Sequence, residues 1–262
     1  MCLILFAYQK HPDYPLIMLS NRDEFFNRPS QAAHFWPDLP DIFAGRDQEA
    51  AGTWLGINKN GRIAAVTNFR ETLANPAQPQ SQSRGELTTR FLQGNQHPNT
   101  YLQNIDKQQH RYSGFNLLVG SFEQLYYYSN RQRLIQQLPR GIHGLSNGLL
   151  NSPWPKVDTG KAALRQHLEL LDRQALINIL LDSQQPDDAL LPNTGIGIEA
   201  ERMLGSRFIS SEHYGTRAAT LLLIDKNGDI DFIEQTFLPD GSKGQIIEQR
   251  IHRQPPSVTR PL

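Results

Sequence analysis

The chain opens with the apolar run Cys2-Leu3-Ile4-Leu5-Phe6-Ala7, and a second run, Leu16-Ile17-Met18-Leu19, follows after the polar turn at residues 10–13. Short apolar runs bounded by turn residues are typical of buried strands, so the two runs predict a β-hairpin. The second run continues into Ser20-Asn21-Arg22-Asp23-Glu24, a polar cluster at the expected end of its strand. Because antiparallel pairing brings the start of one strand beside the finish of the other, residues 21–24 are expected near Cys2.

The same patterns, read along the rest of the chain, predict an α+β protein. Further strands are expected at residues 54–57, 62–66, 115–119, 125–128, 220–224 and 230–234, and helices at 85–93, 100–108, 159–171 and 173–181. Asn58-Lys59-Asn60-Gly61 and Asp225-Lys226-Asn227-Gly228 each separate two strands, and Asn-Gly supplies the positive φ angles of a tight hairpin. A β-rich start, a mostly helical middle and a β-rich end favour layered sheets covered by helices.

Composition narrows the class of protein. The 262 residues, of which 38% are hydrophobic, are expected to form one domain over residues 1–262, with an exposed loop at 75–83 and a weakly ordered tail from about residue 253. The net charge of zero argues against nucleic acid as a partner. The apolar runs are shorter than the ~20 residues that cross a bilayer, so no integral membrane association is expected. The sequence sets no oligomeric state.

The start of the chain also lacks the pattern of a signal peptide, so a cytoplasmic location is expected. The single cysteine, Cys2, excludes an intrachain disulfide and any multi-cysteine metal site. No metal site is predicted.

Cys2 has two interpretations. Removal of Met1 would leave Cys2 with both a thiol and a free α-amine, whose reference pKa of about 7.7–8.0 suits it to accept the thiol proton. Alternatively, Cys2 is a small buried hydrophobic residue that opens an apolar strand. A retained Met1 would block the amine, so the state of the N-terminus separates the two.

Several ordered motifs carry a family resemblance. They are Met1-Cys2, Asn21-Arg22-Asp23-Glu24, Thr67-Asn68-Phe69-Arg70-Glu71, Ser83-Arg84-Gly85, His143-Gly144-Leu145-Ser146-Asn147, Pro153-Trp154-Pro155-Lys156-Val157 and Tyr214-Gly215-Thr216-Arg217. On these motifs, which cover most of its length, the chain resembles the N-R-D-E family, also called the Transport and Golgi Organization family. Relatives in that family are implicated in haem or lipid handling and trafficking.

A more distant resemblance links the same places to the choloylglycine and penicillin V amidases. Met1-Cys2 is similar to their nucleophile, and Asn21-x-Asp23 to their motif after the second strand. Asn68, Asn147 and Arg217 match further active-site positions. Ser20 stands where those enzymes carry an arginine, and the arginine of this chain is Arg22 instead. The resemblance implies a four-layer αββα sandwich of N-terminal nucleophile hydrolase type.

The resemblance also implies roles for individual residues. The implied catalytic set contains Cys2 as nucleophile, Asn68 and Asn147 as donors to the developing oxyanion, and Asp23 and Arg217 as groups that order the nucleophile and its amine. The substrate-binding set is Asn21, Arg22, Glu24, Trp54, Arg70 and His213. For residues 21–24 the alternative is a solvated turn with an Arg22–Glu24 surface pair. Arg22, Arg46, Arg70, Arg84 and Arg217 either converge on an anionic group or form ordinary surface ion pairs.

Two functions of different class follow. The first is a cysteine amidase or acyl-transfer enzyme that acts on a non-peptide amide or a thioester and requires no cofactor. The second is a binding or trafficking protein that carries haem or an acylated ligand, with His143, His213 or Cys2 as candidate haem ligands. An isolated histidine is more often an ordinary surface or core residue. In both readings the partner is a small molecule.

Overall fold

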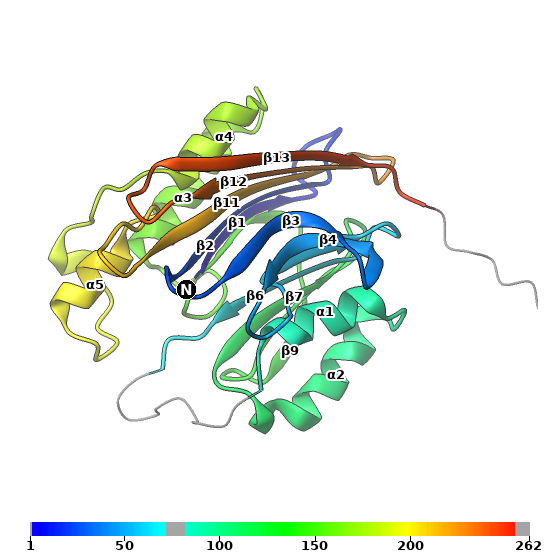
Figure 1. Cartoon of the computed structure of the whole chain (residues 1–262), viewed down its shortest axis with the longest axis horizontal. Coiled ribbons are helices and arrows are strands. Elements are labelled where there is room, and N and C mark those ends of the chain that lie inside the picture. The colour runs from blue at the N-terminus through cyan, green and yellow to red at the C-terminus, as the bar shows by residue number, and fades with distance from the viewer. Residues whose placement is uncertain (1, 72–81, 255–262) are drawn as a thin grey trace, which may run out of the picture.

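A computed structural model describes residues 2–71 and 82–254, and these residues form two antiparallel sheets (Figure 1). The first sheet has six strands in the order β10-β1-β2-β11-β12-β13, with bounds Gly141–Leu145, Cys2–Tyr8, Leu16–Phe25, Tyr214–Ile224, Ile230–Phe237 and Lys243–Ile251. The second has seven strands in the order β3 to β9, with bounds Ser30–Trp36, Leu39–Asp47, Leu55–Asn58, Ile63–Asn68, Phe115–Gly120, Leu125–Ser129 and Leu134–Gln137.

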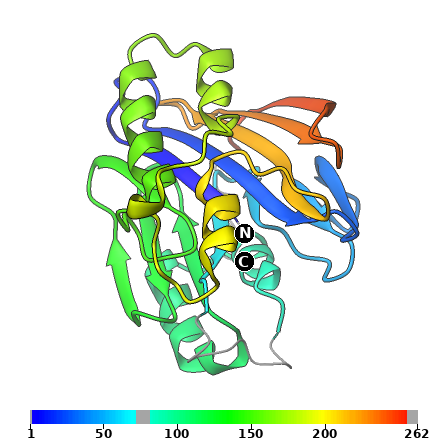
Figure 2. The same cartoon turned by 90° about the vertical axis from the view of Figure 1, so that its left-hand side faces the viewer.

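Helices cover the outer face of each sheet. The covering helices are Gly85–Gln93 (α1), Pro98–Gln108 (α2), Pro155–His167 (α3) and Arg173–Leu180 (α4). A further helix, Ile198–Gly205 (α5), lies to one side of the sheets, and short 3-10 turns occur at Gln109–Arg111 and Asp188–Leu190. In Figure 1, α1 and α2 lie below the second sheet, and α3 and α4 lie on the far side of the first. Figure 2 shows α3 and α4 side by side as a pair.

Three apolar clusters hold these layers together. One, which includes Phe6, Phe43 and Phe232, fills the space between the two sheets. A second packs α3 and α4 on the first sheet, and a third packs α1 and α2 on the second. Each sheet therefore buries both faces, and the layer order is helix, sheet, sheet, helix. The predicted α+β class and the four-layer αββα sandwich are confirmed.

The hairpin expected at the start of the chain is present. In its register Cys2 lies opposite Arg22, so residues 21–24 lie near Cys2 as predicted. The prediction that β2 ends before this motif is wrong, because β2 runs to Phe25. Its backbone continues to pair with β11 through Asp23 opposite Thr216, whatever the polarity of the side chains. The turns at Gly61 and Gly228 have positive φ angles of +82° and +85°, as Asn-Gly hairpins require.

The middle of the chain is less helical than predicted, because β9 and β10 follow the two predicted strands β7 and β8. The patterns also missed β3, β4, β9, β10, β13 and α5. Strand β13 alternates weakly and is largely exposed, which removes the apolar signal that marks a buried strand. Of the loop predicted at 75–83, residues 75–81 lie outside the described part of the chain, as do residues 255–262 of the predicted tail.

Candidate functional site

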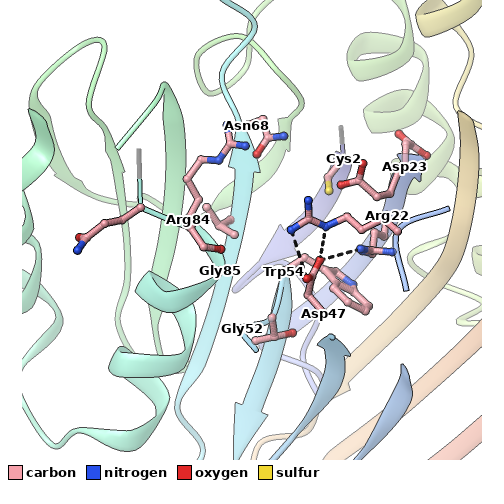
Figure 3. A pocket seen from close by; sticks show the side chains of 15 residues that line it. Cys2, Arg22, Asp23, Asp47, Gly52, Trp54, Asn68, Arg84 and Gly85 are labelled. Atoms are coloured by element: carbon pink, nitrogen blue, oxygen red, sulfur yellow. Dashed lines mark hydrogen bonds and ion pairs between the residues drawn. The ribbon is translucent and has the colours of Figure 1, made fainter. Parts of the chain in front are cut away.

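A cleft of about 310 Å³ opens where the two sheets meet at the Cys2 end (Figure 3). Strands β1 and β2 form one wall. The opposite wall comes from β6, the segment after β4 and the first turn of α1. The lining residues are Cys2, Arg22, Asp23, Glu24, Arg28, Asp47, Gly52, Thr53, Trp54, Val66, Asn68, Gln82, Ser83, Arg84 and Gly85. The cleft therefore gathers five segments of the chain, around residues 2, 22–28, 47–54, 66–68 and 82–85.

Cys2 opens β1 and its thiol lines this cleft. The residue is half-buried, and the desolvation of its thiol raises the pKa, an effect to which the carboxyl of Asp23 adds. The positive charge of Arg22 lowers the pKa of the thiol. Because burial dominates, the thiol is protonated at neutral pH, and a reaction at Cys2 requires a base that takes its proton.

Asp23 lies beside Cys2 and is buried. Its Oδ1 accepts a hydrogen bond of 2.7 Å from Thr216 Oγ1, and its backbone oxygen accepts one of 2.9 Å from the hydroxyl of Tyr214. Burial raises the pKa of this carboxyl, whereas the positive charge of Lys156 and the bond from Thr216 lower it. The protonation state of Asp23 therefore depends on the balance between its burial and the opposing effects of Lys156 and Thr216.

Lys156, at the start of α3, is the buried side chain whose positive charge most lowers the pKa of Asp23. Its Nζ donates to the backbone oxygen of Leu204 at 2.8 Å, and burial lowers its pKa to about 8. Sequence reasoning assigned no role to Lys156, Thr216 or Tyr214. All three stand in motifs that carried the family resemblance, so the signal was present but only Arg217 was taken from it.

Arg22 is held between an aromatic ring and a carboxylate. Its guanidinium lies 4.4 Å from the ring centroid of Trp54, and its Nη2 is 3.2 Å from Asp47 Oδ2. Arg28 Nε donates to the same Asp47 oxygen at 2.6 Å. Asp47 therefore neutralises two arginines of the cleft wall, and sequence reasoning missed it. Glu24 also lines the cleft.

The two predicted oxyanion donors have different places. Asn68, at the end of β6, lines the cleft. Asn147 is fully buried, and its Nδ2 donates to the backbone oxygen of Asn68 at 2.8 Å. Its own backbone oxygen accepts the N–H of Arg70 at 2.7 Å. The structure therefore gives Asn147 a direct part in positioning Asn68 at the cleft wall.

Asn21 and Arg70 lie outside the cleft. Asn21 is buried on the helical side of β2, where its Nδ2 donates to the backbone oxygens of Leu180 and Arg207 at 2.9 and 2.8 Å. Arg70 Nη1 forms a buried ion pair of 2.5 Å with Glu201 and its guanidinium stacks on a tryptophan ring. Both side chains tie loops and helices to the sheets.

Arg217 and His213 also lie away from the cleft. Arg217 occupies the irregular position of β11, and its Nη1 donates to the backbone oxygens of Phe25 and Arg28 at 3.0 and 3.2 Å. It thereby holds the segment that follows β2. The side chain of His213 is 79% exposed in a turn. His143 is buried, and its ring nitrogens contact the backbone oxygen of Pro139 and the side chain of Asn151.

Of the predicted site residues, the cleft therefore brings together Cys2, Arg22, Asp23, Glu24, Trp54 and Asn68. Of the five arginines considered, Arg22 and Arg84 line it. Within residues 2–71 and 82–254, no three His, Cys, Asp or Glu side chains are grouped so that they could hold a metal ion. In the same residues, no helix is long and apolar enough to cross a bilayer.

Two antiparallel sheets between two helical layers, with a cysteine at the head of β1 beside the cleft, define a protein of the N-terminal nucleophile hydrolase fold class. The chain belongs to the Transport and Golgi organisation 2 family, whose family model matches residues 1–239. It is 35% identical to the mouse Transport and Golgi organization 2 homolog over 263 residues, which is 91% of this chain and 94% of the relative. The bovine homolog is 36% identical over 261 residues, with the same coverage.

Two solved structures were also found to be similar. A C2A mutant of the conjugated bile acid hydrolase from Clostridium perfringens aligns with a TM-score of 0.43 and 11% identity, over 95% of this chain and 92% of the other. An N-acylethanolamine-hydrolyzing acid amidase ortholog from Caenorhabditis elegans aligns with a TM-score of 0.38 and 8% identity, over 85% and 92%.

Proposed function

We propose that this protein is an N-terminal cysteine hydrolase that cleaves a non-peptide amide or a thioester in the cleft, after removal of Met1. The observation that carries the proposal is the position of the Cys2 thiol, which lines the cleft next to the buried carboxyl of Asp23. A free α-amine at Cys2 would supply the base that the raised pKa of the thiol calls for.

The reaction would proceed in two balanced steps. The α-amine takes the thiol proton while Sγ attacks the carbonyl carbon, and the side-chain amide of Asn68 donates to the oxyanion. When the tetrahedral species collapses, the C–N or C–S bond breaks and the ammonium returns its proton to the leaving group. Water then gives a proton to the amine and attacks the Cys2 thioester, which releases a carboxylic acid and restores the thiol.

The experiment begins with the intact mass of the untagged protein, which reports whether Met1 is removed. The protein is then mixed with a panel of chromogenic amides and thioesters, and acylation is followed by mass. Because Cys2 is the only cysteine, an acyl-thiol adduct locates the nucleophile without ambiguity. We expect turnover by the form that begins at Cys2 and none by Cys2→Ala.

A matched control keeps the thiol and removes only the base. A short N-terminal extension ahead of Cys2 leaves the side chain in place but converts the α-amine to an amide. We expect at least a hundredfold loss of turnover with this form, in the range of general-base contributions, which are about 10²–10⁴. Equal turnover with and without the free amine, or by Cys2→Ala, would refute the proposed mechanism.

A second function is favoured by the raised pKa of the Cys2 thiol, since a protonated thiol is a poor nucleophile. In this alternative the cleft binds and carries haem or an acylated ligand without reaction. A titration with haem would then shift the Soret band. Cys2→Ala would abolish the shift, whereas His213→Ala, at an exposed side chain outside the cleft, would leave it unchanged. Absence of a shift at micromolar haem would contradict haem binding.

A further inference from the structure

Arg84 is brought to the cleft by a close contact between two glycines. Ser83-Arg84-Gly85 leads into α1, and the backbone of Gly85 lies directly against that of Gly52. A Cβ added to Gly52 would lie 2.5 Å from the carbonyl carbon of Gly85, so a side chain there would push the two segments apart. Thr88 Oγ1 also donates to the backbone oxygen of Thr53 at 2.5 Å. The start of α1 is thereby fixed against the cleft.

Arg84 shares the cleft with the carboxylate of Glu24, whose charge raises the pKa of Arg84 but which is not within ion-pair distance of it. Asp47 neutralises the other two arginines of the cleft, Arg22 and Arg28. Among the described residues, no carboxylate forms an ion pair with Arg84, and its Nη1 makes only a 3.4 Å bond to the backbone oxygen of Gly114. The side chain is half-buried, and this desolvation lowers its pKa.

A desolvated cation without a counter-ion is costly, because it loses water contacts and gains no ion pair in return. A guanidinium has five N–H donors in a planar fork that matches carboxylate and phosphate oxygens. Within residues 2–71 and 82–254, the Arg84 guanidinium uses one of them, in the bond to Gly114. The arrangement is that of a cation that receives its anion from outside the chain.

Arg84 also acts on the reacting end of the cleft. The guanidinium lies beside Asn68, across the cleft from Cys2 (Figure 3). Burial lowers the pKa of Arg84, and the negative charges of Glu24 and, to a smaller extent, of a Cys2 thiolate raise it. The N-terminus of α1 adds a partial positive charge at the same wall.

We propose that Arg84 binds an anionic oxyacid group, a carboxylate or a phosphate, that belongs to the ligand of the cleft. As a specificity-determining residue it would make the substrate an amide or thioester that carries such a group near its reacting carbonyl. That the ligand is a substrate rests on the proposed function. The anion site itself does not, because it requires only the cleft and the Arg84 guanidinium that lines it.

The test uses Cys2 as a reporter. Iodoacetate and iodoacetamide both alkylate thiols, and they differ in that the first is an anion and the second is neutral. The rates of Cys2 alkylation by the two reagents are measured by intact mass and divided by the rates for N-acetylcysteine. The resulting preference for iodoacetate measures the attraction of the cleft for an anion and needs no turnover.

The matched variants are Arg84→Gln, Arg84→Lys and Arg133→Gln. Arg133 is an arginine whose side chain is 60% exposed and pairs with Asp106 outside the cleft. We expect Arg84→Gln to reduce the preference for iodoacetate about tenfold, the size of one nearby charge in a medium of intermediate dielectric constant. Arg84→Lys should restore part of it, and Arg133→Gln should leave it unchanged.

Several results would overturn the proposal. They are an unchanged preference in Arg84→Gln, an equal loss in Arg133→Gln, or a wild-type preference that does not fall when salt is raised. The salt series uses the wild-type protein, so the proposal stays testable if Arg84→Gln fails to fold. If the preference behaves as expected and no acyl substrate is turned over, the hydrolase proposal fails while the anion site stands.

A competition experiment distinguishes the two anions. Glutarate, inorganic phosphate and neutral glutaramide are each tested for protection of Cys2 against iodoacetamide. Protection by glutarate assigns a carboxylate, and protection by phosphate assigns a phosphate group. Protection by glutaramide as strong as that by the anions contradicts a site that recognises charge, as does a lack of protection by all three.

Discussion

The two ends of the layer between the sheets are built on the same strands but have opposite character. At one end, side chains in register across β1, β2, β11 and β12 form an apolar row, which consists of Phe6, Met18, Leu222 and Phe232. Nearer the cleft, on the same face, the rows contain polar side chains. The row two residues along consists of Ile4, Ser20, Thr220 and Glu234. The row four residues along consists of Cys2, Arg22, Ala218 and Thr236.

The apolar end of this layer stabilises the fold, and the polar end holds the reactive groups. At the apolar end the two sheets pack directly, and the four side chains are at most 1% exposed. At the polar end the buried charges keep the interior from closing in the same way, and the cleft lies there. Substitutions at the first end should therefore change folding, and those at the second should change charge and reactivity.

The largest expected effect comes from the apolar row. Phe6→Ala removes a fully buried ring that also contacts His143 at a centroid distance of 5.2 Å. We expect the free energy of unfolding to fall by about 3–5 kcal/mol, measured by chemical denaturation. Leu170→Ala, at a side chain that is 82% exposed, serves as control and should change it by less than about 0.5 kcal/mol. Equal losses in both variants would contradict the assignment of stability to the apolar row.

The next effect belongs to the polar end and depends on pH. Burial raises the pKa of Glu234 from 4.5 to about 7, so between these values the folded chain keeps a proton that the unfolded chain has lost. The stability conferred by this proton is complete below pH 4.5 and is lost as pH rises to about 7. The Glu234→Gln side chain cannot ionise, so its stability does not change with pH in this way.

We therefore compare the wild type and Glu234→Gln in denaturation series at several pH values. Between about pH 4.5 and about pH 8, the wild type should lose roughly 3 kcal/mol more than the variant. The backbone N–H of Ala33, which donates to Glu234 Oε1 at 2.7 Å, finds an acceptor in both proteins. Parallel stability curves would show that Glu234 does not titrate in this range.

The smallest effect concerns the partners of Asp23. Thr216→Val removes the hydroxyl that donates to Asp23 Oδ1 and accepts the backbone N–H of Ile209, at nearly constant volume. We expect a loss of about 2 kcal/mol at neutral pH, because a buried donor and a carboxylate each lose a partner. The exposed Thr100→Val should be close to neutral. A Thr216→Val protein as stable as the wild type would contradict the assigned hydrogen bonds.

Local patterns predicted the elements that have strong local signals. The first two apolar runs predicted β1, the start of β2 and the proximity of Cys2 to residues 21–24, and the amphipathic pattern at 85–93 gave the bounds of α1. Strand β13 was missed because it is a largely exposed edge strand, and β4 was missed because its buried residues are limited to its centre, between polar ends. The end of β2 was missed because its pairing with β11 is a tertiary contact.

The candidate site was predicted in part. The motifs led to Cys2, Arg22, Asp23, Glu24, Trp54 and Asn68, which line the cleft. Asn21 and Arg217 stand in the same motifs yet hold backbone oxygens elsewhere. A motif marks residues that the fold requires without separating those that support a wall from those that face the cavity. Asp47 has no motif at all, and its role appears only beside Arg22 and Arg28.

The hairpin that opens the chain, the turns at Gly61 and Gly228 and the family could all be predicted from sequence, because they depend on neighbours in the chain and on ordered motifs. Which charges share the cleft depends on tertiary packing. Arg84 directly precedes α1 and Asp47 ends β4, and neither is near Cys2 in sequence. Their meeting depends on how two sheets and a helix pack, and on the close contact of Gly52 with Gly85, which no local propensity encodes.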